Sequence, residues 1–208
     1  MEIMNQIESL KKIAKSKLGK NDPAHDFEHV MRVYRNAQII SKNENGNEKL
    51  ILSAVLLHDI IKIKNRKNSA LKSAKLSEII LKENCFLDDE IKIISDAIKE
   101  HSFSKGKIPS TIEGKILQDA DRLDAIGAIG LARVFSFSGS NNRPFYDPKD
   151  PFSKNRNLND NKWTIDHFYE KLLFLEGKMN TKTGKLLAKK RTIILKNFLK
   201  EIKNEIQP

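Results

Sequence analysis

Apolar residues recur every three or four positions along almost the whole chain, which is the spacing of one face of an α-helix. Short polar turns separate the segments that carry this pattern, and no segment shows the strict alternation of a half-buried strand. The pattern therefore predicts an all-α protein of about eight or nine helices. The expected helices include residues 2–18, 48–62, 68–84, 88–102, 164–178 and 181–204. A further helix begins at Pro23 and ends near Asn45-Gly46, and another opens at Ser110 and carries an aspartate cluster. After Gly127 the apolar pattern continues through Phe137.

Local signals predict where some of these helices begin. Asp22-Pro23 is typical of an N-cap followed by proline at the first helical position. Ser110 and Glu113 have the spacing of a capping box, in which each side chain bonds the backbone of the other residue. Residues 138–160 are rich in Ser, Asn, Pro, Gly and Asp and predict one long loop, of the kind that is often a functional lid or disordered.

The length and composition favour a single soluble domain. A chain of 208 residues can bury one sizeable core, which we expect within about 22–180, with the helix at 181–204 packed on it. No apolar run approaches the ~20 residues needed to span a bilayer, and the first residues lack the basic-then-apolar order of a signal peptide. The single cysteine, Cys85, excludes an intramolecular disulfide. We therefore expect a cytoplasmic protein with no membrane partner.

The chain is basic, with 38 Lys and Arg against 27 Asp and Glu and a formal charge of +11. The lysines are spread over nearly every segment, and no basic stretch carries the interleaved aromatic residues of a single-strand nucleic-acid binder. We interpret the charge as a generally basic surface and expect no nucleic-acid partner. The alternative is a field that concentrates polyanionic substrates such as nucleotides.

The adjacent pair His58-Asp59 lies at the end of an apolar helical run. Neighbouring side chains on a helix diverge by about 100°, so the pair can serve one metal only where the helix meets other elements that supply ligands. A carboxylate among apolar residues is costly unless it is paired or binds a metal. Partners of suitable type are His29 upstream and His101 downstream.

His25 and His29 are four residues apart and therefore share a helix face, which Arg32 extends. Imidazole and guanidinium groups on one face suit a metal with an anionic ligand beside it, because Arg binds phosphate through two parallel hydrogen bonds. The alternative for each histidine is an exposed helical position without a ligand role.

Three aspartates, Asp119, Asp121 and Asp124, fall within six residues. They cannot all face one point, so one is the expected fourth ligand and another could orient a ligand histidine. A set of two His and two Asp suits Mn²⁺, Fe²⁺, Co²⁺, Ni²⁺ or Mg²⁺ better than a structural zinc ion, which usually takes thiolates.

The order His29, His58-Asp59, Asp121 resembles the H…HD…D signature of the HD-domain metal-dependent phosphohydrolases. This resemblance implies a single HD-domain helical bundle and places one divalent metal, with Mn²⁺ favoured, on these four residues. The resemblance, and not the spacing, selects Asp121 over Asp119. Matching patterns flank the signature at residues 29–33 and 120–124.

The similarity extends over about 25–180 to a bacterial branch that has nucleoside-triphosphate pyrophosphatase members, through the blocks 113–128 and 167–173. His101 falls where binuclear members place an additional histidine, which implies a phosphate contact or a second metal. The alternative is a histidine stabilised by the dipole at the end of its helix. Some similar single-metal nucleotidases carry an acid where this chain has Lys62, so the general acid or base stays open.

The resemblance implies hydrolysis of a (deoxy)nucleoside triphosphate to monophosphate and pyrophosphate by a metal-activated water. Asp59, His101, Lys62 and His25 are the candidate catalytic residues, with His25 or His101 moving the proton. The candidate substrate-binding residues are Arg32, Arg122, His167 and Lys171.

The alternatives are a nucleotide phosphomonoesterase or phosphodiesterase on the same site, or a non-catalytic regulatory module that binds metal and nucleotide. In each case the expected partner is a small phosphorylated molecule. Whether the chain forms a homodimer is left open.

Overall fold

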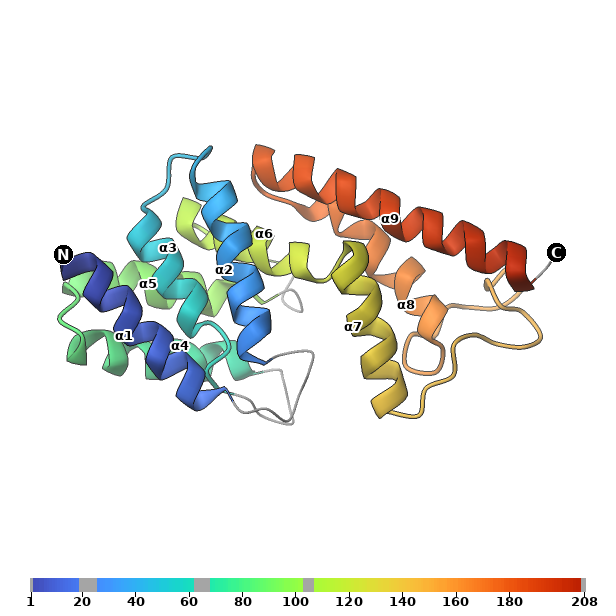
Figure 1. The fold of residues 1–208 in the computed structure, drawn as a ribbon, viewed down its shortest axis with the longest axis horizontal. Helices are drawn as coiled ribbons and strands as arrows, with labels where there is room; N and C mark the ends of the chain where they lie inside the picture. Colours follow the sequence, from blue (N-terminus) through green and yellow to red (C-terminus); the bar gives the residue numbers. More distant parts are fainter. Residues whose placement is uncertain (1, 19–25, 62–67, 103–106, 207–208) are drawn as a thin grey trace. The chain divides into compact units, whose positions relative to one another are not determined.

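The computed structural model describes residues 2–18, 26–61, 68–102 and 107–206, and every regular element within these ranges is helical (Figure 1). The prediction of an all-α protein is confirmed. No helix in this part of the chain combines the length and apolar character needed to cross a membrane. The elements are α1 (Glu2–Lys17), α2 (Phe27–Ser41), α3 (Glu48–Leu57), α4 (Ser69–Glu83), α5 (Asp88–Glu100), α6 (Ile112–Asp124), α7 (Gly127–Ser140), α8 (Thr164–Glu170), η3 (Leu172–Phe174), η4 (Glu176–Lys178) and α9 (Lys182–Ile206).

The chain divides into two compact units, each described here by itself. The first unit comprises Met1–Asp121 and Asn180–Gly184, and the second comprises Arg122–Met179 and Lys185–Pro208. Helices α6 and α9 each have their first residues in the first unit and the remainder in the second. The expectation of a single domain over the whole chain stays a prediction.

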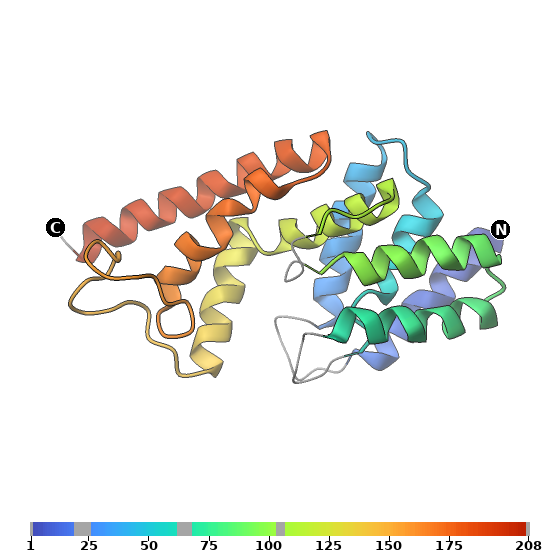
Figure 2. The same ribbon diagram turned by 180° about the vertical axis from the view of Figure 1, so that it is seen from behind.

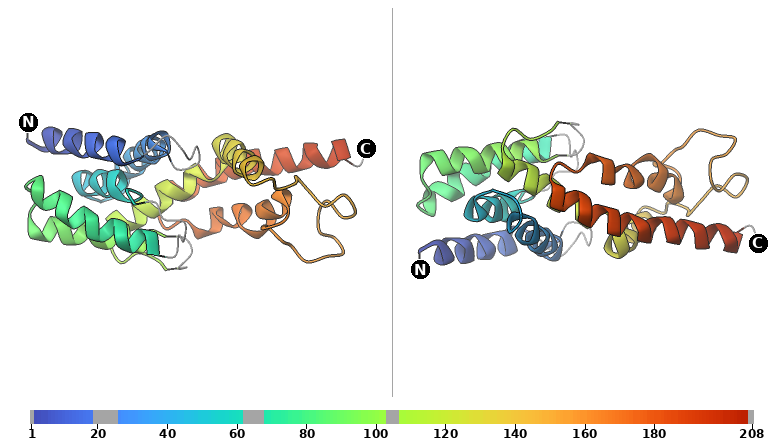
Figure 3. Two further views of the ribbon diagram at one scale, coloured as in Figure 1. Left: turned by 90° about the horizontal axis from the view of Figure 1, so that it is seen from below. Right: turned by 90° about the horizontal axis from the view of Figure 1, so that it is seen from above.

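Helix α3 is the centre of the first unit. It lies between α1 and the α4–α5 pair and also contacts α2 (Figure 3), while α4 and α5 run side by side (Figure 2). Every residue from Leu50 to Leu57 is buried, so this helix has no solvent-facing side along that stretch. Each fully buried Leu, Ile or Val contributes roughly 1.5–3 kcal/mol relative to an exposed one. The continuous apolar run in the sequence reflects this surrounded position.

Helix α3 ends earlier than its apolar pattern predicts. Its last residue is Leu57, and residues 58–60 form a turn, so the expected helix over 48–62 is too long. Helix α4 holds the chain after this turn, because the Ser73 hydroxyl accepts the Ile61 amide at 3.2 Å and the Ser69 hydroxyl donates to the Ile61 carbonyl at 2.6 Å. His58 and Asp59 therefore project from a turn held between two helices.

Helices α2 and α6 have N-caps that the sequence signals did not identify. Helix α2 begins at Phe27 and is capped by Asp26, whose carboxylate accepts the His29 amide at 2.8 Å. The predicted start at Asp22-Pro23 lies outside the described residues. Helix α6 is capped by Thr111, whose hydroxyl accepts the Gly114 amide at 3.1 Å. The side chains of the expected capping box have other partners in the structure. Ser110 donates to the Glu100 carboxylate, and Glu113 accepts the Asn47 amide.

An aromatic cluster in the second unit includes the fully buried Phe168. Phe135 contacts Phe145, Phe168 and Phe198 with ring centroids 5.0, 6.2 and 5.6 Å apart, within the range of favourable aromatic pairs. The expected helix over 164–178 is wrong, because α8 ends at Glu170 and two short 3₁₀ turns follow. Lys171 interrupts the helix, since its φ of −132° lies outside the α-helical range.

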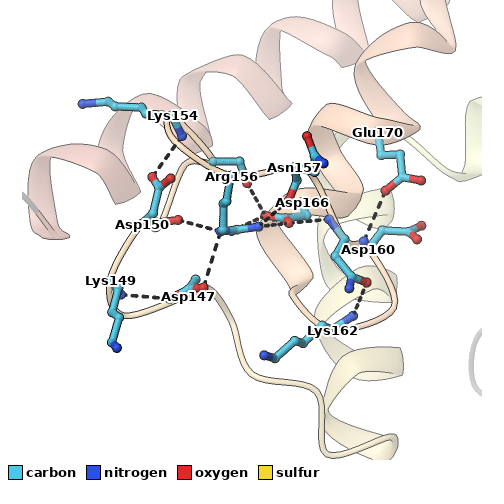
Figure 4. Close-up of polar contacts among 12 residues, drawn as sticks. Asp147, Lys149, Asp150, Lys154, Arg156, Asn157, Asp160, Lys162, Asp166 and Glu170 are labelled. Atoms are coloured by element: carbon cyan, nitrogen blue, oxygen red, sulfur yellow. Dashed lines mark hydrogen bonds and ion pairs between the residues drawn. The ribbon is translucent and has the colours of Figure 1, made fainter.

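The loop between α7 and α8 has its own polar network (Figure 4). The fully buried Asp166 accepts two hydrogen bonds from the Arg156 guanidinium, at 2.5 and 2.8 Å, and one from the Asn159 amide at 2.7 Å. The Asp150 carboxylate accepts the backbone amides of the turn that precedes Arg156. A buried carboxylate with paired guanidinium and amide donors is satisfied, so this predicted loop has a defined conformation.

The close connection between α6 and α7 generates a test of the fold. A Cβ atom on Gly130 would lie 2.3 Å from the carbonyl oxygen of Ala125. Because that oxygen belongs to the backbone, no side-chain rotation can relieve the clash. We expect Gly130→Ala to lower the free energy of unfolding by roughly 1–3 kcal/mol, as overpacking does elsewhere. The measurement is urea unfolding followed by circular dichroism.

Gly139 on the same helix is the matched control, because a Cβ there meets nothing within 4 Å. Gly139→Ala should leave stability unchanged or raise it by up to about 1 kcal/mol through helix propensity. Equal unfolding midpoints for the two variants would contradict the close approach at Gly130.

Candidate metal centre

Three buried histidines from separate parts of the first unit converge. His29 lies in the first turn of α2, His58 follows α3 and His101 follows α5. The ring centroids of His29 and His58 are 5.7 Å apart, and those of His58 and His101 are 5.1 Å apart. The structure therefore brings together histidines that are separated by 29 and 43 residues in the sequence.

His58 and His101 are oriented by the same local device. Each is the C-cap of its helix, and each ring Nδ1 lies close to the carbonyl oxygen three residues earlier, at 2.7 Å for Val55 and 2.5 Å for Ile98. A carbonyl oxygen only accepts, so Nδ1 carries the proton in both rings. The Nε2 atom is then the one directed away from the helix and toward the other histidines.

Two carboxylates approach these Nε2 atoms. Asp121 Oδ1 is 3.5 Å from His29 Nε2. Asp59 lies between the other two rings, with Oδ2 3.8 Å from His58 Nε2 and Oδ1 4.0 Å from His101 Nε2. Both aspartates are partly exposed, so the site is open to solvent on their side.

The donor atoms form two groups that could each hold a metal ion, and His58 belongs to both. In each group the ligand atoms lie within 4.8 Å of one another. The groups are His29, His58 and Asp121, and His58, Asp59 and His101.

The environment of His58 fits a metal ligand. Its Nε2 is buried and has no hydrogen-bond partner among the described residues. A buried nitrogen in that condition costs roughly 1–3 kcal/mol. The nitrogen–carboxylate separations of 3.5 to 4.0 Å are too long for hydrogen bonds. They are below the roughly 4.2 Å that separates opposite ligands of an ion bound at about 2.1 Å.

His101 is neutral at neutral pH. Burial lowers its pKa below the ordinary value of 6.5, and the proximity of His58 lowers it further, against the opposing effect of Asp59. A neutral imidazole with its proton on Nδ1 presents a lone pair at Nε2, which suits a metal ligand or a proton acceptor.

The three neighbouring aspartates have three different surroundings. Asp121 is the one that approaches the histidines. Asp119 is fully buried and accepts the backbone amides of Asn180 and Thr181, both at 2.8 Å, together with the Thr181 hydroxyl. It thereby anchors the start of α9. Asp124, in the second unit, forms a 2.8 Å ion pair with Arg133.

His25 and Lys62 are outside the described residues. Arg32 is half-buried on α2, one turn after His29. Arg122 belongs to the second unit, where its guanidinium donates to the Lys178 carbonyl.

His167 and Lys171 share one partner in the second unit, the carboxylate of Asp160. His167 Nδ1 lies 2.9 Å from it, and Lys171 Nζ donates to it at 2.5 Å. Burial raises the pKa of Asp160, but the bonds from Lys171 and His167 outweigh this and hold it below the ordinary value. Burial and the nearby lysine lower the pKa of His167. The substrate-binding role of these two residues stays a prediction.

The sequence analysis did not identify two polar residues that support the centre, Gln118 and Asn180. Gln118 contacts the chain around His101, and Asn180 contacts both Gln118 and Asp119. The contact between Gln118 and Asn180 joins residues 62 positions apart. No local sequence pattern predicts such a pair. A Gln-Asp dipeptide inside an apolar helical segment does indicate that the two side chains have buried polar contacts.

Comparisons with known proteins agree with this geometry. Residues 26–126 match the family model of the HD domain. The chain is 32% identical to the protein YpgQ of Bacillus subtilis (strain 168), over 99% of this chain and 96% of the relative.

Solved structures are similar over nearly the whole length. The crystal structure of Bacillus subtilis YpgQ in complex with ADP has a TM-score of 0.78 and 29% identity, covering 100% of this chain and 98% of that one. An HD-superfamily hydrolase from Bacillus thuringiensis has a TM-score of 0.75 and 32% identity, covering 99% and 97%. Sequence, fold and the convergence of the histidines thus lead to one assignment: the chain belongs to the HD-domain superfamily of metal-dependent phosphohydrolases.

Proposed function

We propose that this protein hydrolyses (deoxy)nucleoside triphosphates to the monophosphate and pyrophosphate with a bound divalent cation, Mn²⁺ being favoured. The observation that carries the proposal is the convergence of imidazole nitrogens and carboxylates around the buried Nε2 of His58. Such a nitrogen and oxygen donor set suits Mn²⁺, Mg²⁺, Co²⁺, Ni²⁺ or Fe²⁺.

The ligands in this proposal are His29, His58, Asp59 and Asp121. A bound divalent cation in such a site lowers the pKa of a coordinated water and polarises a phosphoryl oxygen. The chain contributes the orientation of that chemistry. The Nδ1 bond of His58 to the Val55 carbonyl fixes its ring, so that its Nε2 is already directed at the centre before any ligand binds.

His101 is the candidate proton carrier that the described part of the chain offers. Its Nε2 faces Asp59, and its lowered pKa leaves it able to accept a proton at neutral pH. Because His101 also belongs to the second donor group, a second metal at that position is the alternative role. The sequence-based candidates His25 and Lys62 remain open for the same step.

A nucleotide as the substrate is supported by two observations. Bacillus subtilis YpgQ, which is similar over the full chain, has been crystallised in complex with ADP. The basic surface, with its formal charge of +11, attracts polyanions. Arg32, one turn from His29, is the residue of the first unit that we propose binds the phosphates. Arg122, His167 and Lys171 are the further candidates.

Nucleotide binding without turnover is the second candidate function. A complex between a relative and ADP is equally expected of a module that senses nucleotides. Phosphomonoester or phosphodiester hydrolysis on the same donor set is the third. These functions differ in their products, so one experiment separates them.

Reaction products and metal dependence test the proposed function directly. Protein stripped with chelator should be inactive, and Mn²⁺ restored alone should give monophosphate and pyrophosphate from a nucleoside triphosphate. The measurement is chromatographic resolution of products from triphosphates, monophosphates and a phosphodiester, with Mn²⁺, Mg²⁺, Co²⁺ or Ni²⁺ added singly. Nucleoside and phosphate as products would instead identify a phosphomonoesterase. No turnover with any metal would favour nucleotide binding without hydrolysis.

Asp121 and Asp119 should respond differently to substitution, because only Asp121 is a proposed metal ligand. Asp121→Asn and His58→Ala should each lower turnover by more than the 10–100-fold that is typical of residues hydrogen-bonded to a metal ligand. Each should also abolish the rise in melting temperature that Mn²⁺ produces by binding the native state. Asp119→Asn should keep both properties. It should instead cost roughly 1–3 kcal/mol of stability, because an amide group would then face donors of Asn180 and Thr181.

Calorimetric titration of Mn²⁺ and thermal unfolding of the three variants measure these effects. Near wild-type turnover in Asp121→Asn would falsify the ligand assignment. Loss of the metal-dependent stabilisation in a folded Asp119→Asn would move the ligand role to the other aspartate.

A further inference from the structure

Gln118 is a buried amide on the helix that carries Asp121, one turn before it, with 1% of its surface exposed. Its Nε2 donates to three backbone carbonyls: Glu100 at 3.4 Å, His101 at 3.2 Å and Lys107 at 3.1 Å. Glu100 is the last residue of α5, and His101 and Lys107 belong to the connection from α5 to α6. One side chain therefore fixes the backbone of His101 against the helix of Asp121.

The other end of the same amide is also bound. Gln118 Oε1 accepts a hydrogen bond from Asn180 Nδ2 at 3.0 Å, and the Asn180 side chain in turn donates to Asp119 at 2.9 Å. Reversing the amide would place an NH₂ group against the Asn180 donor and an oxygen against the carbonyl oxygens. The network therefore allows a single orientation of Gln118.

A buried glutamine at this position needs an explanation. Ordering its side chain costs rotamer entropy, and its polar atoms must all be paired. The neighbouring Leu117 shows that the same helix buries apolar side chains fully. What an apolar residue cannot supply at Gln118 is a donor for the carbonyl of His101.

We propose that Gln118 is a positioning residue for His101. The Nδ1 bond to Ile98 fixes the ring on one side, and Gln118 fixes the backbone on the other, so that His101 Nε2 stays directed at Asp59. Asn180, which donates to Gln118 Oε1, connects the position of Gln118 to the start of α9. The catalytic consequence rests on the proposed function, whereas the positioning itself does not.

The test reads the position of the histidine directly. In chelator-treated wild-type protein labelled with ¹⁵N-histidine, the Nδ1 protons of His58 and His101 should both be protected from solvent exchange, because both rings are buried and bonded to carbonyls. Gln118→Met, which keeps length but removes the donor, should abolish or shift the His101 signal and leave the His58 signal in place.

Gln6 provides the matched control. Its amide also donates to two backbone carbonyls of a turn, those of Asn84 at 2.9 Å and Cys85 at 3.3 Å, but that turn joins α4 to α5 and carries no candidate ligand. Gln6→Met should leave both imidazole signals and turnover at wild-type values. With a triphosphate substrate, Gln118→Met should lower kcat by about 10- to 100-fold, the effect of a catalytic group displaced by about 1 Å.

An unchanged His101 signal in folded Gln118→Met would overturn the proposal. If that variant does not fold, Asn180→Ala decides, because it removes the partner of Gln118 Oε1 and leaves the carbonyl bonds in place. A smaller shift of the His101 signal in the same direction supports the proposal, and no shift overturns it. If the wild-type protein has no hydrolytic activity and Gln118→Met still displaces the His101 signal, the positioning role stands and the proposed function is rejected.

Discussion

The burial of His58 is the constraint on which the arrangement of the first unit depends. The central helix α3 is apolar on all sides, and it ends in an imidazole whose Nε2 has no hydrogen-bond partner among the described residues. Such a nitrogen is tolerable in an apolar core only if something else satisfies it. The neighbouring elements supply that environment, because α2 contributes His29, α5 contributes His101 and α6 contributes Asp121. The same packing that buries α3 therefore delivers the donor atoms.

The use of helix ends explains how these donors reach one point. Neighbouring residues on a helix face different directions, so a rigid helix could not present both His58 and Asp59 to one centre. Ending α3 at Leu57 releases the pair into a turn. His101 repeats the device at the end of α5, with the same bond from Nδ1 to the carbonyl three residues earlier. A short local hydrogen bond thus sets both the tautomer and the direction of each ring.

The sequence predicts the helices well because their apolar periodicity is local and long. Helix starts are harder to predict. Ser110 has the sequence pattern of a capping residue, but its hydroxyl donates to Glu100, ten residues earlier, and Thr111 caps the helix instead. His29, His58 and His101 could be predicted to converge because histidines with nearby carboxylates are rare in apolar segments. The supporting contact of Gln118 with Asn180 could not be predicted, since it depends on a segment that arrives 62 residues later and matches no local pattern.

The charge of the donor set links the candidate centre to the basic surface. Metal ligands must be deprotonated, so two carboxylates and neutral imidazoles together contribute two negative charges, which a divalent cation balances. A centre balanced in this way provides little net attraction for a nucleotide that carries several negative charges. That attraction must come from side chains outside the donor set. Under the proposed function, Arg32, half-buried one turn from His29, is the local candidate for this attraction, and the excess of lysines attracts polyanions over longer distances, where salt screens the effect. The basic composition, which carries no aromatic pattern for nucleic acid, is thus consistent with a site that must attract a small polyanion.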